Sequence, residues 1–158
     1  MKIKLSPDIC YMAGLTRNRM DRNAVGIITG IKEIAERFAG IANKEFGIEP
    51  KKIIESESKG IRKIYFYHSR VSKRLGEIRS KEDRLFRAPN EAALSYLAGI
   101  IDSSARFSSN GIYIEALTPQ DEVFLANLGI HTRNGRVSNI SMLVKLAKPY
   151  STVLKSLV

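Results

Sequence analysis

The stretch Ser95-Tyr96-Leu97-Ala98-Gly99-Ile100-Ile101-Asp102-Ser103-Ser104-Ala105-Arg106-Phe107 begins as an apolar segment and ends in a short polar break. It carries two small residues, Ala98 and Gly99, side by side. A helix with such a pair on its apolar face lets another helix come very close, because no long side chain separates the backbones. Residues 9–20 repeat the pattern around Ala13 and Gly14. Two such helices predict two half-domains that pack through these four small residues.

Both stretches resemble a known motif. Residues 96–107 resemble the LAGLIDADG motif of homing endonucleases and maturases, and residues 11–20 resemble a more degraded copy. The resemblance implies an α+β fold. Two pseudo-symmetric αββαββα-like halves would pack through the paired motif helices, and their mixed or antiparallel sheets would form a saddle. Residues 1–88 would form the first half and residues 89–158 a second, shorter half of one compact unit.

The order of elements repeats between the halves, which supports this reading independently of the motif letters. The first half predicts the motif helix, a strand from residue 24, a helix capped by Thr29 and ended by Gly47, a hairpin and a helix. The second half predicts the motif helix, a strand, a helix begun by Thr118, a short hairpin at Asn134-Gly135 and a closing helix. The charged run at residues 80–87 reads as a solvated linker between them.

The ends of the two motifs depart from the family pattern. In the family, the last acidic residue of each motif holds the catalytic divalent metals, but here those positions are Arg19 and Ser104. The sequence therefore predicts no catalytic residue, no metal site and no cofactor. Mg²⁺ enters only under an alternative, a residual DNA endonuclease that recruits the displaced acids Asp21 or Asp102.

Charge gives the main signal of function. The chain has 26 Lys and Arg against 16 Asp and Glu, a net charge of +10, and basic domains of this size often bind nucleic acid. We expect a catalytically inactive LAGLIDADG-type protein that binds duplex DNA through a basic saddle. Structured RNA, as in maturases, is an alternative ligand, and a protein-interaction scaffold with incidental charge is a third class. The candidate contacts are Arg17, Arg19, Arg22, Lys63, Tyr65, Tyr67, Arg106, Tyr113, Arg133 and Arg136.

One point about these contacts stays open in the sequence. The strand from residue 61 alternates, with Ile64 and Phe66 on one face and Lys63, Tyr65 and Tyr67 on the other. Glu55 and Glu57 share one face of the partner strand. If that is the face of Lys63, cross-strand ion pairs would weaken the case for a nucleic-acid surface.

Composition places the chain among soluble globular proteins, with 44% hydrophobic and 27% charged residues. No apolar run is long enough for a membrane span, so we expect no membrane partner. The single cysteine, Cys10, fits a reducing cytoplasm, and one cysteine with two histidines far apart cannot build a zinc site. We expect a cytoplasmic monomer.

Overall fold

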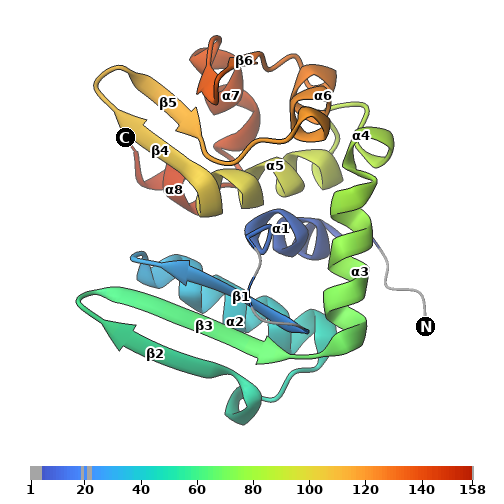
Figure 1. Cartoon of the computed structure of the whole chain (residues 1–158), viewed down its shortest axis with the longest axis vertical. Coiled ribbons are helices and arrows are strands. Elements are labelled where there is room, and N and C mark those ends of the chain that lie inside the picture. The colour runs from blue at the N-terminus through green and yellow to red at the C-terminus, as the bar shows by residue number, and fades with distance from the viewer. Residues whose placement is uncertain (1–4, 19, 21–22, 158) are drawn as a thin grey trace.

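The computed structural model describes residues 5–18, 20 and 23–157, so Arg19, Asp21 and Arg22 lie outside the described residues. Helices α1 (Pro7–Leu15) and α5 (Glu91–Ser104), here called the motif helices, lie against each other between two sheets (Figure 1). The expected α+β fold with paired motif helices is confirmed.

Local sequence fixes where each motif helix begins. The Ser6 side chain accepts a hydrogen bond from the N–H of Ile9 at 3.2 Å, and the Asn90 side chain accepts one from the N–H of Ala93 at 2.9 Å. Both side chains satisfy backbone donors that a first turn leaves free.

The motif helices touch backbone to backbone at their glycines. A Cβ atom on Gly14 would lie 2.2 Å from the Tyr96 carbonyl oxygen, and one on Gly99 would lie 2.2 Å from the Tyr11 carbonyl oxygen. No side chain can occupy such a space, so the two glycines set the distance between the halves.

The first sheet has three antiparallel strands in the order β1 (Ala24–Thr29), β3 (Ile61–Tyr67), β2 (Ile54–Ser58). Helix α2 (Lys32–Phe46) covers one face, where Phe38 and Phe66 lie 5.8 Å apart between ring centroids. Figure 1 shows α2 behind the strands, so the opposite face looks toward the viewer. A 3-10 turn (Pro50–Lys52) precedes β2, and α3 (Ser69–Ser80) follows β3.

The second sheet has four strands in the order β4 (Ala105–Ser108), β5 (Gly111–Ile114), β7 (Arg136–Val137), β6 (Thr132–Arg133). Its helices are α6 (Pro119–Asn127), α7 (Ile140–Ala147) and α8 (Thr152–Ser156). Asn134 and Gly135 form the tight turn between β6 and β7 with φ of 52° and 82°, as their sequence predicts. The two strands have 2 residues each, so the second hairpin is short, as expected.

Two expectations about local structure are wrong. Thr29 does not cap α2, because its hydroxyl accepts from the N–H of Ile31 and the helix begins one residue after Ile31. The run at residues 80–87 is not a solvated linker either. It contains α4 (Glu82–Leu85), whose Glu82 is only 1% exposed, and Phe86, directly after this helix, is buried as well. Amphipathic packing against α5 and α6 overrides the polar composition.

Among the described residues, every helix is too short or too polar to cross a lipid bilayer.

Candidate nucleic-acid interface

Each sheet has an open face, the one opposite its packed helices. On the second sheet the strand pairings align four of the sequence-predicted contacts. Arg106 pairs with Tyr113, Tyr113 with Arg136, and Arg136 with Arg133. Ile112, Ile114 and Val137 face the core, so their neighbours on these strands face outward. The arginine row, Arg106-Tyr113-Arg136-Arg133, therefore crosses all four strands on the open face.

The side chains of the arginine row are exposed or half-buried, and weak contacts hold them. The Arg106 guanidinium lies 5.4 Å from the Tyr113 ring centroid and 3.7 Å from the Glu115 carboxylate. Arg106 and Glu115 are both exposed, and such a pair is worth little in water. Arg136 lies beside Gly111, where a Cβ atom would meet its Nε at 3.4 Å. A phosphate group can therefore replace the existing partner of Arg106 at small cost.

On the first sheet the register answers the question that the sequence left open. Glu57 pairs with Arg62, and Glu55 pairs with Ile64, a buried residue. Both glutamates thus point to the face opposite Lys63, where the Arg62 guanidinium lies 3.2 Å from Glu55 and 3.8 Å from Glu57. They cannot neutralise Lys63. The predicted alternation along β3 is confirmed, since Ile64 and Phe66 are buried.

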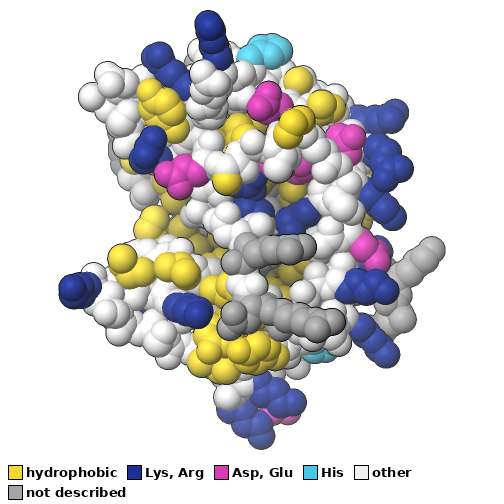
Figure 2. All heavy atoms as spheres, viewed as in Figure 1, with side chains coloured by type: hydrophobic (Ala, Val, Ile, Leu, Met, Phe, Trp, Pro, Cys, Tyr) yellow, Lys and Arg dark blue, Asp and Glu magenta, His cyan; other side chains and the backbone are white. Residues whose placement is uncertain are grey.

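The open face of the first sheet is mostly apolar. Figure 2 shows hydrophobic side chains gathered over the lower half of the molecule, where Figure 1 places this sheet. We call the outward-facing residues of this sheet the isoleucine–tyrosine face, which consists of Ile28, Ile54, Ile61, Tyr65 and Tyr67, with Lys63 among them as a cation. Tyr65, Tyr67 and the adjacent Lys63 were predicted contacts. The isoleucines were missed, although period-2 spacing along β3 puts Ile61 on the face of Lys63.

Arg17 is an exception among the predicted contacts that the structure describes, because it points into the protein. Its side chain is 8% exposed, and its guanidinium lies 2.6 Å from the Asp121 carboxylate. It also donates hydrogen bonds to the Ser104 hydroxyl and to the carbonyl oxygens of Glu115 and Ala116. Arg17 ties the end of α1 to the second half and is not available to a phosphate.

A buried polar cluster continues from Arg17 through Asp121 to Glu82 and Tyr96. The Tyr96 hydroxyl donates to the Glu82 carboxyl at 2.5 Å. Burial, followed by the hydrogen bond to Asp121, raises the pKa of Glu82 to about 8. Burial alone would raise the pKa of Asp121, but hydrogen bonds from Glu82 and the Thr118 backbone outweigh it and hold that pKa below its usual value. Glu82 therefore acts as a neutral donor and Asp121 as the anion that pairs with Arg17.

Asp102, one of the two acids in the endonuclease alternative, uses its carboxylate for hydrogen bonds inside the protein. Its carboxylate accepts hydrogen bonds from the Tyr11 hydroxyl at 2.6 Å and the Ser151 hydroxyl at 2.6 Å. It also accepts from the N–H groups of Thr152 and Val153 at the start of α8. The side chain has no exposed surface, which leaves no room for a metal ion.

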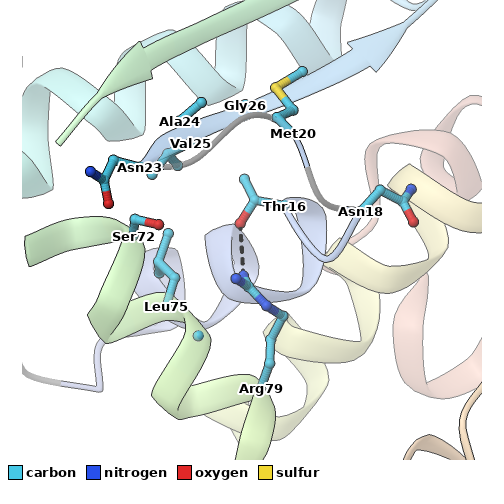
Figure 3. Close-up of a pocket in the computed structure, with 11 residues that line it drawn as sticks. Thr16, Asn18, Met20, Asn23, Ala24, Val25, Gly26, Ser72, Leu75 and Arg79 are labelled. Atoms are coloured by element: carbon cyan, nitrogen blue, oxygen red, sulfur yellow. Dashed lines mark hydrogen bonds between the residues drawn. The ribbon is translucent and has the colours of Figure 1, made fainter. Parts of the chain in front are cut away.

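A cavity of about 450 Å³ lies beside the end of α1, between β1 and α3 (Figure 3). Arg79 forms part of its wall and donates to the Ala13 carbonyl oxygen and the Thr16 hydroxyl. Its described lining residues are Thr16, Asn18, Met20, Asn23, Ala24, Val25, Gly26, Ser72, Leu75, Gly76 and Arg79. None of these is a carboxylate. Among the described residues, no three His, Cys, Asp or Glu side chains are grouped so that they could hold a metal ion.

Solved structures of the homing endonuclease I-DmoI are similar to this chain. Its complex with DNA and Ca superposes with a TM-score of 0.70 at 13% identity and covers 97% of both chains. Its complex with DNA and Mn gives a TM-score of 0.65 at 15% identity, covering 91% of this chain and 97% of that one. A structure of its mesophilic variants gives a TM-score of 0.67 at 14% identity, covering 90% of this chain and 96% of that one.

The sequence itself matches no protein-family model and no curated protein. The likeness thus lies in the arrangement of elements, over nearly the whole length of both chains. The chain has the fold of a LAGLIDADG homing endonuclease.

Proposed function

We propose that the protein binds duplex DNA through the open face of its second sheet and does not cut it. The arginine row carries the proposal, since it sets three guanidinium groups and a phenol in line across four strands. The similar I-DmoI structures, which are complexes with DNA, support the choice of ligand.

The size of the row suits a duplex. Neighbouring strands lie about 4.8 Å apart, so four strands place the first and last arginines about 14 Å apart. That is close to the ~12 Å width of the major groove of B-DNA. Arginine side chains at the two ends of the row can then reach phosphates on both sides of one groove, while Tyr113 lies between them.

The lack of cleavage rests on what occupies the metal-binding positions of the motifs. Ser104 stands at one of them, and its hydroxyl accepts a hydrogen bond from Arg17. Arg19 stands at the other and lies outside the described residues. Asp102 is saturated by four donors inside the fold. Asp21, also outside the described residues, is the remaining candidate acid of the endonuclease alternative.

The test compares two double variants by fluorescence anisotropy with a labelled random duplex at several salt concentrations. Arg133→Ala with Arg136→Ala removes two cations of the row. Arg70→Ala with Arg84→Ala removes two exposed cations from α3 and α4, at an edge of the molecule in Figure 1. The two double variants have the same net charge. We expect the first to weaken binding and to lower the slope of log K against log salt by about 2, and the second to change either quantity little.

Several outcomes would contradict the proposal. Equal losses in the two double variants would mean that only overall charge matters. Tighter binding to a structured RNA than to duplex DNA would replace the ligand class with RNA. Products on a gel that require Mg²⁺ would show that the protein cuts, and their loss in Asp21→Asn would identify Asp21 as the acid.

A further inference from the structure

The isoleucine–tyrosine face leaves large apolar side chains in water. Ile28 is 64% exposed, Ile61 54% and Tyr67 55%. Four of the residues on this face, Ile61, Lys63, Tyr65 and Tyr67, follow one another along β3, the central strand. Exposed apolar groups that are contiguous on a sheet mark a surface that contacts a ligand.

The face also has an unusual balance of charge. Its described residues include one cation, Lys63, and no carboxylate, because Glu55 and Glu57 turn to the opposite face. The arginine row on the other sheet has three cations. One cation among apolar groups suits contacts to the uncharged bases of a nucleic acid more than to its phosphates, and without carboxylates the face does not repel a polyanion.

The two tyrosines form a supported platform. Tyr65 lies directly over Gly26, where an added Cβ atom would come within 2.4 Å of the Tyr65 Cβ. The Lys63 ammonium lies 5.3 Å from the Tyr65 ring centroid, and the Tyr67 ring stands edge-on to it at 5.5 Å. Ring packing of this kind limits the freedom of the side chains before a ligand arrives.

We propose that the isoleucine–tyrosine face binds unpaired bases, so that the preferred ligand is duplex DNA with a single-stranded extension. This rests on the proposed function, because the duplex part would occupy the arginine row. Paired bases offer only their edges to a sheet, whereas unpaired bases offer flat apolar faces that stack on aromatic rings. Stacking contributes about 1–3 kcal/mol per base without any base-specific hydrogen bond.

The choice of bases over a protein partner follows from the setting of the face. The sheet that carries it and the sheet that carries the arginine row flank one pair of motif helices (Figure 1). A nucleic acid bound on the second sheet can therefore extend past the motif helices to the first sheet. The single lysine can bind one backbone phosphate, while the rings and isoleucines contact the bases between phosphates.

The experiment measures the affinity of three labelled ligands: a blunt duplex, the same duplex with a single-stranded extension, and the extension alone. We expect the tailed duplex to bind at least about 10-fold more tightly than the blunt one, the size of one to two stacked bases. Tyr67→Ala should abolish the difference, because it removes a ring on which the unpaired bases would stack. Tyr67→Phe keeps the ring and should keep the difference. Arg133→Ala with Arg136→Ala should weaken both duplex ligands alike.

A second measurement locates the contact. With 5-iodouracil in the extension, ultraviolet light should crosslink the DNA to the peptide that holds Tyr65 and Tyr67, and with the same base in the duplex it should not. Equal affinity for blunt and tailed duplexes, or an unchanged preference in Tyr67→Ala, would overturn the inference while the proposed function stands. Failure of all three ligands to bind would overturn the proposed function and this inference with it.

Discussion

Two tyrosines at the same motif position perform the same task with different partners. Tyr11 donates its hydroxyl proton to Asp102, and Tyr96 donates to Glu82. Both hydroxyls lie in the core, where an unsatisfied donor costs about 1–3 kcal/mol. The sequence shows both tyrosines but not the acceptors of their hydroxyl groups, because these acceptors lie 91 and 14 residues away along the chain. The same limit explains why Arg17 looked like a phosphate contact, since its partner Asp121 is 104 residues distant.

Glycine at the helix contact gives the first prediction. Gly99→Ala forces a methyl group against the Tyr11 carbonyl oxygen, with 2.2 Å available, so the helices must separate. We expect a loss of at least about 2 kcal/mol in the free energy of unfolding, measured by urea denaturation. Gly40→Ala is the matched control. Gly40 lies inside α2 with open space around it, so alanine there should raise the free energy of unfolding by about 0.5–1 kcal/mol. Equal effects of the two changes would mean that the motif helices are not in close contact.

The carboxyl of Glu82 gives a prediction about pH. Its pKa is about 8 in the folded protein against an ordinary value of 4.5, so the folded state holds a proton that the unfolded chain loses between these values. Stability should therefore fall as pH rises from about 4.5 to 8, by at most about 1.4 kcal/mol per pH unit. Asp121, whose pKa is lowered, changes its charge, and with it the stability, only at more acidic pH.

Glu82→Gln tests this point, because the amide keeps a donor and an acceptor but does not titrate in this range. Urea denaturation at pH 5 and pH 8 should show a smaller difference in the variant than in the wild type. An identical pH dependence in both proteins would assign the slope to another group.

At the scale of elements, the sequence predicts a helix well where a cap is local. Ser6, Asn90 and Thr118 each begin a helix as expected, and Thr118 with Asp121 makes a complete capping box. It fails at α2, which begins without a side-chain cap, and at α4, where four residues become helical through packing alone. The two hairpins were predicted and are present, but their register was not predictable, so the sequence did not show on which face Glu55 and Glu57 lie.

Helix α8 depends on a carboxylate from another element. Asp102→Ala leaves the hydroxyls of Tyr11 and Ser151 and two N–H groups of α8 without their acceptor inside the protein. We expect a loss of about 3–5 kcal/mol in the free energy of unfolding, and faster proteolysis of the C-terminal segment. Asp8→Ala removes the same charge from an exposed pair with Lys44 and should cost less than about 1 kcal/mol. If Asp102→Ala left both the free energy of unfolding and the rate of proteolysis unchanged, Asp102 would not be what holds α8 in place.

At the scale of the molecule, the fold was readable from two short motifs and a repeated order of elements. The candidate site was readable only in part. Residue type and alternation pointed to Lys63, Tyr65, Tyr67 and to the arginine row, but the row as a line exists only once four strands take their register. The contrast between a cationic sheet and an apolar sheet is likewise a property of the assembled molecule, because it depends on which side chains each register turns outward.

The contacts that join the halves make them complementary rather than interchangeable. Arg17 and Asp102 stand three residues after the glycines of their motifs, and each reaches a side chain of the other half, Asp121 and Arg37. In these two contacts the first half thus offers the cations and the second half the anions. A pair made of two first halves would hold only the cations, and a pair of two second halves only the anions. Neither could form these ion pairs, so the contacts favour the pairing of unlike halves.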